Sequence, residues 1–189
     1  MARSAGSWQY EPMTESAILN WHDYFVTVAQ VSATLAGLLF VGLTISLGHV
    51  LQGYGYLMRA FTALFLQFEM LLIGLFVIIP GQPPFVLGCE LIVTGAAILG
   101  GISLFARNFP ESETSQVLGS KGPRTVRAVL TYIGTLMPVV AGIGLIAKMP
   151  SAFYFLIPGE IACLYLSIGN AWVFAVEIPR RAAEREKIL

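Results

Sequence analysis

Residues 24–48 read YFVTVAQVSATLAGLLFVGLTISLG, and this stretch decides the fold class. It lies in a run of 35 residues, between Asp23 and Arg59, that contains no Asp, Glu, Lys or Arg. A helix needs roughly 20 apolar residues to cross a hydrocarbon core of about 30 Å. The stretch is long enough and apolar enough to cross once, so we predict a transmembrane helix over residues 24–48.

Four further apolar stretches satisfy the same criterion. Charged residues or proline-containing connections such as Pro80-Gly81-Gln82-Pro83-Pro84 separate them, and a proline disfavours continuation of a helix. The expected spans are residues 57–79, 85–106, 128–147 and 152–176. The sequence therefore predicts an all-α polytopic membrane protein, with a bundle of five transmembrane helices inside residues 24–179.

Composition and charge exclude several other classes of protein. Of the 189 residues, 56% are apolar and only 12% are charged, and the formal net charge is zero. A nucleic-acid-binding protein needs a clustered positive field, so no nucleic-acid partner is expected. Cys89 and Cys163 lie inside apolar stretches, which indicates neither a disulfide scaffold nor a CxxC zinc site. We predict no cofactor and no metal; the one alternative is a soft-metal site of Cys89, Cys163, Glu90 and Glu160, if the third and fifth spans touch.

The distribution of Lys and Arg predicts the orientation of the chain. Residues 1–23 lack the apolar core of a cleavable signal peptide and are expected to form an interfacial segment. Nine of the eleven Lys and Arg fall on the side of the 107–127 loop and the 180–189 tail. Cytoplasmic segments carry the excess of positive residues. We therefore predict an N-terminus outside, a cytoplasmic 107–127 loop, and a basic cytoplasmic tail that lies against the lipid bilayer.

Three glutamates lie inside the expected spans. Glu69 falls near the bilayer midplane, and Glu90 and Glu160 lie several residues inside the outer edge. An ionised carboxylate at the bilayer centre costs about 2.5–3.5 kcal/mol on insertion scales, so each group has to pair, hydrate or stay protonated. No Lys or Arg shares their depth. The expected partner is water, a cation, a proton, a hydroxyl, a backbone carbonyl, or an amide such as that of Gln67.

Polar and small residues recur at helical spacing in the first and fifth spans. Steps of three and four residues place them on one side of a helix. The fifth-span stripe consists of Glu160, Cys163, Ser167, Asn170, Phe174 and Glu177. The first-span seam consists of Thr27, Gln30, Thr34, Gly37, Val41, Thr44 and Gly48. A mostly polar stripe is not expected to face lipid.

Small residues indicate where helices pack closely. Ala29, Ala33 and Gly37 stand at small-xxx-small spacing, and Gly134 and Gly142 give the fourth span a small-residue face. Two interpretations of these polar and small residues stay open. They either pack helices together, inside one bundle or between identical subunits, or they line a hydrated path or ion site with the three glutamates.

Transport is the function that these features favour. The sequence contains no phosphate-loop, HExxH or GxSxG motif, so no enzyme is predicted. The first hypothesis is a homo-oligomeric ion or small-solute channel or transporter, with a path lined by the first and fifth spans and the three glutamates. The second hypothesis is a non-transporting regulator or interaction partner of another membrane complex.

Several segments in the first half of the chain resemble one family of bacterial membrane proteins. They are Trp21-His22-Asp23-Tyr24-Phe25, residues 36–43 (AGLLFVGL) with Ser46-Leu47, Arg59-Ala60, Pro80-Gly81-Gln82 and Leu87-Gly88-Cys89-Glu90-Leu91. In order and spacing they are similar to a family of small uncharacterised bacterial polytopic membrane proteins, some of which are labelled modulators of the membrane-bound FtsH protease. The resemblance implies a protein of the bacterial cytoplasmic (inner) membrane. Glu90 matches the family's pattern, whereas Glu69 stands where apolar residues are usual.

Overall fold

The computed structural model describes residues 13–51, 54–107, 121–149 and 151–180. Every regular element within these ranges is helical, and no strand occurs among them. The helices are α1 (Met13–Ile45), α2 (Leu47–Val50), α3 (Tyr54–Val77), α4 (Pro84–Arg107), α6 (Lys121–Ile146), the short η1 (Ala152–Phe155), α7 (Leu156–Trp172) and η2 (Val173–Glu177). η2 is a π-helix that continues α7 directly. The predicted all-α fold class is confirmed.

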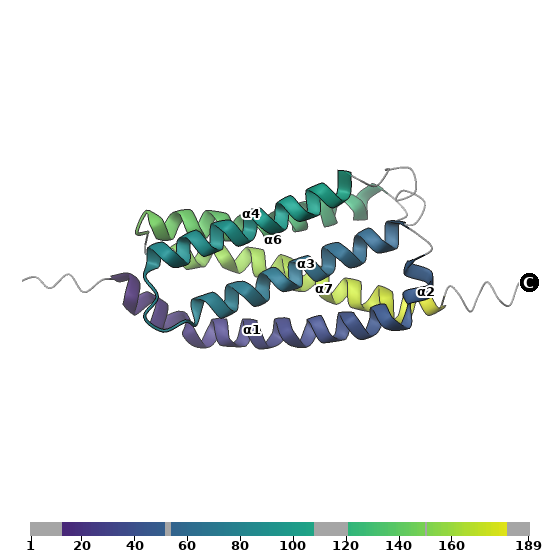
Figure 1. The fold of residues 1–189 in the computed structure, drawn as a ribbon, viewed down its shortest axis with the longest axis horizontal. Helices are drawn as coiled ribbons and strands as arrows, with labels where there is room; N and C mark the ends of the chain where they lie inside the picture. Colours follow the sequence, from purple (N-terminus) through teal and green to yellow (C-terminus); the bar gives the residue numbers. More distant parts are fainter. Residues whose placement is uncertain (1–12, 52–53, 108–120, 150, 181–189) are drawn as a thin grey trace, which may run out of the picture.

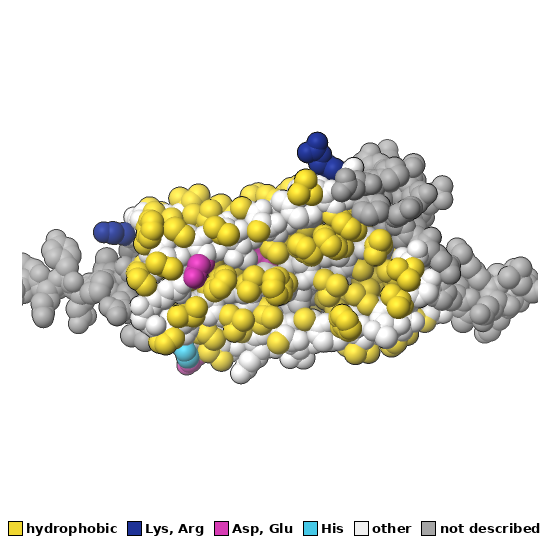
Figure 2. All heavy atoms as spheres, in the orientation of Figure 1, with side chains coloured by type: hydrophobic (Ala, Val, Ile, Leu, Met, Phe, Trp, Pro, Cys, Tyr) yellow, Lys and Arg dark blue, Asp and Glu magenta, His cyan; other side chains and the backbone are white. Residues whose placement is uncertain are grey.

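Within the described ranges, five helical segments are long and apolar enough to cross a membrane. They are Trp21–Ile45, Gly55–Val77, Pro84–Arg107, Thr125–Ile146 and Ala152–Arg180. Their helices run side by side along the long axis of the molecule in Figure 1, and the start of α1 and the end of η2 lie at opposite ends. Figure 2 shows hydrophobic side chains over the visible face, with dark blue Lys or Arg side chains at the left end and on the upper edge, right of centre. The chain is therefore a multi-pass membrane protein built as a five-helix bundle.

Two helices begin earlier than the apolar stretches alone indicate. α1 starts at Met13, inside the expected interfacial segment, and α6 starts at Lys121, inside the expected 107–127 loop. Pro123 is compatible with helix because the first turn has backbone N–H groups that need no acceptor within the helix. Residues 1–12 of the interfacial segment, 108–120 of the loop and 181–189 of the tail lie outside the described residues.

A buried serine connects the end of α1 to the end of the fifth membrane-spanning segment. Ser46 separates α1 from α2, so α1 ends before residue 48, the expected limit of the first span. The Ser46 hydroxyl donates a hydrogen bond to the backbone carbonyl of Phe174 in η2. Because both groups are buried, this bond satisfies two polar atoms that lipid could not.

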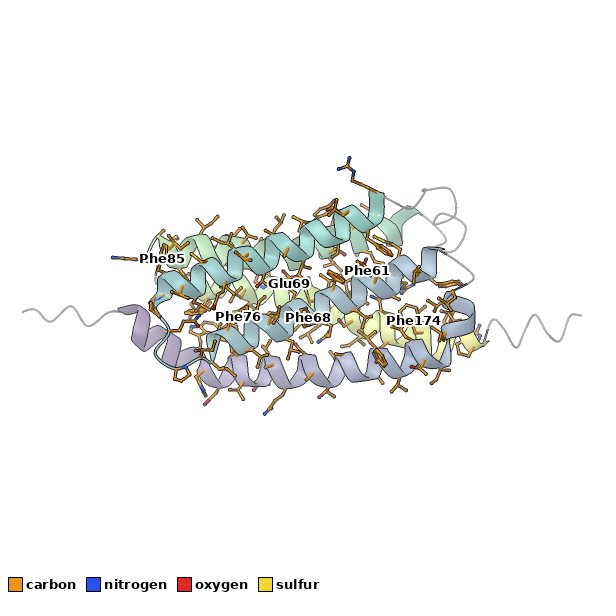
Figure 3. The ribbon with its side chains drawn as sticks, in the orientation of Figure 1. Phe61, Phe68, Glu69, Phe76, Phe85 and Phe174 are labelled. Atoms are coloured by element: carbon orange, nitrogen blue, oxygen red, sulfur yellow. The ribbon has the colours of Figure 1, made fainter. Side chains whose placement is uncertain are left out.

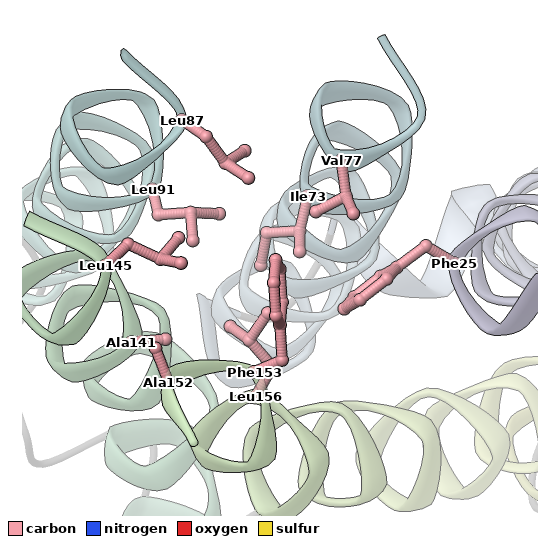
Figure 4. Packing of buried hydrophobic residues seen from close by; sticks show 10 residues of the cluster. All are labelled: Phe25, Ile73, Val77, Leu87, Leu91, Ala141, Leu145, Ala152, Phe153 and Leu156. Carbon is pink, nitrogen blue, oxygen red and sulfur yellow. The ribbon is translucent and has the colours of Figure 1, made fainter. Parts of the chain in front are cut away.

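The interior consists of three clusters of buried apolar side chains that follow one another along the bundle. α3 contributes to all of them, with Ile73 in the first, Leu66 in the second and Ala63 in the third. Figure 4 shows the first cluster, in which the rings of Phe25 and Phe153 pack 5.7 Å apart, centroid to centroid. Lipid tails are as apolar as these side chains, so dense packing stabilises the bundle more than the exclusion of water does.

α4 and α6 approach each other through a pair of glycines. A Cβ atom added to Gly142 would lie 2.5 Å from the backbone oxygen of Gly88, and one added to Gly88 would lie 2.7 Å from that of Gly142. Real side chains do not tolerate such distances. Glycine at both positions therefore sets the separation of these two helices.

Candidate functional site

Glu69 of α3 is the most completely buried carboxyl in the described residues. Its exposed fraction is 0%, and neither carboxyl oxygen has a hydrogen-bond partner among those residues. Figure 3 shows Glu69 near the middle of the bundle's length. A Cβ atom added to Gly95 of α4 would lie 3.6 Å from Glu69 Oε1 and 2.8 Å from the backbone oxygen of Thr135 in α6. Glu69 therefore points towards the contact between α4 and α6.

Glu160 of α7 is the second interior carboxyl, and it has one partner. Its exposed fraction is 3%, and the Tyr24 hydroxyl of α1 donates a hydrogen bond of 2.5 Å to Oε2. The other oxygen, Oε1, has no partner among the described residues. Glu160 lies eight residues after the start of its span at Ala152, and Glu69 lies eight residues before the end of its span at Val77. The two carboxyls therefore lie at similar distances from the same end of the bundle.

Cys163 connects the surroundings of the two glutamates. It is buried almost one helical turn after Glu160, and it packs in the same apolar cluster as Met70, the neighbour of Glu69 on α3. Its sulfur lies 2.7 Å from the position that a Cβ on Gly134 would occupy. The missing side chain of Gly134 thus makes room for the thiol. We call Glu69, Glu160, Cys163 and Tyr24 the carboxyl site.

Glu90 of α4 does not belong to this site. It is partly exposed, and one of its oxygens accepts a hydrogen bond from the Gln82 amide in the connection between α3 and α4. The structure therefore brings together two of the three glutamates that the sequence singles out. The Tyr24 hydroxyl, which donates to Glu160, and the Gln82 amide, which donates to Glu90, are partners of the expected kinds. Gln67 is not one of them, because its amide donates to the backbone oxygen of Ser32 at 2.8 Å.

The fifth-span stripe faces the interior of the bundle. Five of its six members are buried, and Glu177 is partly buried. Ser167 is fully buried and its hydroxyl has no partner among the described residues. Asn170 is 5% exposed, and its Oδ1 accepts a hydrogen bond of 2.6 Å from Nε of Arg59.

The first-span seam faces away from the bundle, so it does not line a common path with the fifth-span stripe. Thr27, Gln30, Thr34, Gly37, Val41, Thr44 and Gly48 are all exposed. The hydroxyls of its three threonines donate to backbone oxygens four residues earlier in α1, at 2.8–2.9 Å. This local bonding lets threonine hydroxyls stand on an outer face. Bulkier residues of α1, including Phe25 and Leu39, fill the side that faces the core.

The small residues take part in several different contacts. Ala29 packs inside the bundle, where its Cβ lies 2.9 Å from the position of a Cβ on Gly74 of α3. Ala33 and Gly37 lie on the outer face of α1, and nothing surrounds Gly37 within 4 Å of an added Cβ. Gly134 packs against α7, whereas Gly142 packs against α4. The spacing alone does not show that these residues serve different interfaces.

The soft-metal arrangement is not formed. Among the described residues, no group of three or more His, Cys, Asp and Glu could hold a metal ion. Cys163 is buried in the carboxyl site, whereas Cys89 is partly exposed on α4 beside Glu90. The third and fifth spans do not bring both cysteines and both glutamates together.

Tyr24 and Arg59, the hydrogen-bond partners of Glu160 and Asn170, are quoted above within the family-like segments and not as candidate site residues. Each lies within four residues of the start of its span, where an aromatic or a basic residue usually anchors a helix at the interface. Their roles depend on which way each helix is rotated, and the sequence contains no direct signal of that. No protein-family model, no curated protein and no solved structure matches the chain. The family resemblance therefore stays a prediction.

Proposed function

We propose that this protein transports protons or a proton-coupled solute across a bacterial cytoplasmic membrane, with Glu69 and Glu160 as the groups that bind the proton. The observation that carries the proposal is Glu69, whose two carboxyl oxygens are buried without a partner in the described residues. Ionisable groups are rare within membrane spans because they are costly, and those that occur often mark ion paths or proton relays.

A proton fits the site better than a metal ion. The site offers two carboxyls, and neither forms an ion pair within the described residues. A metal ion needs more ligands, and no group of three or more acidic, His or Cys side chains could hold one in the described ranges. A proton needs one oxygen, and it removes the charge that makes a buried carboxylate unfavourable.

Flux through reconstituted protein tests the proposal. Glu69→Gln and Glu160→Gln are expected to abolish or strongly reduce proton flux in proteoliposomes, because an amide cannot take up and release the proton. Glu90→Gln is the matched control, since Glu90 is also a glutamate within a span but lies outside the carboxyl site. We expect it to retain flux. Equal flux through wild type, Glu69→Gln and Glu160→Gln would contradict the proposal.

We further propose that copies of the chain associate through the first-span seam. The seam exposes Gln30, and an amide on a lipid-facing surface is more favourable when a second helix covers it. The exposed Ala33 and Gly37 would let that helix approach closely. In this arrangement the N-terminus lies outside the cell and the C-terminus in the cytoplasm, as the Lys and Arg bias predicts.

The exposed seam also favours a second candidate function. A non-transporting regulator of another membrane complex, such as a membrane protease, would use the same outer face of α1 to bind its partner. Purification from native membranes separates the two functions. A stoichiometric second membrane protein, lost when Gly37 is replaced by Leu, supports the regulator; self-association alone supports the transporter.

A further inference from the structure

A hollow lies between α3, α6 and α7, at the opposite end of the bundle from the connection between α3 and α4. Its volume is about 210 Å³. Its polar lining residues are Arg59 and Thr62 of α3, Arg127 and Thr131 of α6, and Asn170 of α7. A neighbouring hollow of about 370 Å³ shares Arg59, Arg127 and Asn170 and adds Tyr165. The two arginines therefore line both hollows.

Two positive charges face these hollows, and none of the described residues that line them carries a carboxylate. Arg59 and Arg127 are both partly buried, and both line each of the two hollows. Neither forms an ion pair within the part of the chain that the structure describes. Two like charges removed from bulk water are unfavourable unless an anion compensates them. The charge of the site thus favours an anionic ligand.

Asn170 fixes the orientation of one of these guanidinium groups. Nε of Arg59 donates to Oδ1 of Asn170 at 2.6 Å, and Asn170 is itself buried on α7. This bond uses one of the five N–H donors of arginine and leaves the terminal NH₂ groups for a ligand. A planar guanidinium held in place suits phosphate, because two N–H groups can reach two oxygens of one phosphate.

The depth of the site and its apolar wall suit a phosphate group that carries an apolar part. Arg59 and Arg127 lie four and two residues inside the ends of their spans. At about 1.5 Å per residue, both are within about 6 Å of the membrane boundary, close to lipid phosphates. Apolar side chains line the same hollow, namely Met58, Leu66 and Leu166.

We propose that Arg59 and Arg127 form a binding site for a phosphate group, carried by an anionic phospholipid headgroup or by a free phosphate compound. Their terminal NH₂ groups donate to the phosphate oxygens, and the hydroxyls of Thr62 and Thr131 are within the same lining. Asn170 acts as a positioning residue for Arg59. The site is separate from Glu69 and Glu160, so it does not depend on the proposed transport.

The test uses the full chain in a maltoside detergent, which contains no phosphate. Native mass spectrometry measures how much phosphatidylglycerol is retained relative to phosphatidylcholine, whose headgroup is neutral overall. Thermal unfolding is then compared in inorganic phosphate and in chloride at equal ionic strength. Preferential retention of phosphatidylglycerol supports the site and identifies a lipid headgroup. A higher unfolding temperature in phosphate, without lipid preference, supports the site and identifies a soluble ligand.

Single substitutions test whether the lipid retention or the thermal shift arises from binding at the two arginines. Arg59→Gln and Arg127→Gln are each expected to weaken the response about tenfold or more, because a hydrogen bond to a charged group is lost. Arg107→Gln is the control, since Arg107 is an exposed arginine at the same end of the bundle. The proposal is overturned if wild-type protein shows neither response, or if Arg107→Gln weakens the response as much as the other two. The wild-type measurements decide the outcome even where a variant does not fold.

Discussion

The two interior glutamates differ in the hydrogen bonds that they receive. The Tyr24 hydroxyl satisfies one oxygen of Glu160, whereas Glu69 receives no hydrogen bond from the described residues. A buried carboxyl without donors is far less unfavourable when it is protonated. Glu69 is thus the group for which gaining a proton changes the free energy of the bundle most. Its burial costs stability, and we expect that cost to be visible when it is replaced.

Replacing Glu69 by methionine is expected to stabilise the bundle. Methionine has a similar length and no polar oxygens, so the change removes a buried unsatisfied group. Such a group costs about 1–3 kcal/mol, and the free energy of unfolding should rise by a similar amount. Unfolding in mixed micelles, followed by circular dichroism, measures it. A loss of stability would instead mean that Glu69 makes favourable contacts in the native bundle.

Replacing Tyr24 by phenylalanine is expected to destabilise the bundle. The ring packing is kept, but Glu160 loses the only hydroxyl that donates to it within the described residues. We expect the free energy of unfolding to fall by about 1–2 kcal/mol. Tyr154→Phe is the control, because Tyr154 is a 61% exposed tyrosine at the same end of the bundle. An equal effect in both variants would show that the bond to Glu160 contributes nothing.

At the scale of the helices, the five spans could be predicted from the sequence because membrane crossing depends on the total hydrophobicity of about 20 consecutive residues. The length and composition of a stretch determine that total, and both can be counted in the sequence. The ends of α1 and α6 could not be fixed in this way. Their first turns contain charged and polar residues, such as Glu15 and Lys121, which are outside the apolar stretch but compatible with helix.

The inward faces of the helices could be predicted only in part. In α7 the polar stripe faces inward, as its regular spacing suggests, whereas in α1 a stripe of similar spacing faces outward. Threonine hydroxyls such as that of Thr34 donate hydrogen bonds to backbone oxygens of their own helix. The polarity of these residues therefore does not determine the rotation of α1. The contact between Tyr24 and Glu160 depends on that rotation. The carboxyl site could therefore be predicted as separate residues but not as an assembly.

The contact between α4 and α6 is expected to be sensitive to a single methyl group. Gly142→Ala would place a Cβ atom 2.5 Å from the backbone oxygen of Gly88, so the helices would have to move apart. We expect the free energy of unfolding to fall by about 1–3 kcal/mol. Gly100→Ala on α4 is the control, because nothing lies within 4 Å of its added Cβ. Alanine is the better helix former, so this control should be neutral or slightly stabilising. Equal effects of the two variants would contradict the tight α4–α6 contact.

At the scale of the whole molecule, the buried carboxyls and the two partly buried arginines lie at different positions along the bundle. Glu69 lies near the middle of the bundle's length, and Glu160 is, like Glu69, eight residues from the end that contains the connection between α3 and α4. Arg59 and Arg127 lie at the opposite end. The outer face of α1 is separate from both. Association of copies through that face would leave the interior of each bundle unchanged.

A larger side chain on the first-span seam tests this association. Gly37→Leu is expected to reduce the oligomer fraction in native mass spectrometry while leaving thermal unfolding of the monomer unchanged, because the space around Gly37 is open. Gly100→Leu places the same side chain in open space on α4 and should leave the oligomer intact. An oligomer that persists in Gly37→Leu would show that the seam is not the interface.

The most direct test of the central claim is infrared difference spectroscopy of purified protein in lipid, which observes the C=O stretch of protonated carboxyl groups. If Glu69 and Glu160 take up and release a proton, wild-type protein should show this band, and the band should disappear reversibly as the pH is raised. Glu69→Gln should remove a part of the band that Glu90→Gln leaves in place. A band in wild type that does not respond to pH, or one that is identical in Glu69→Gln, would contradict a proton-binding role.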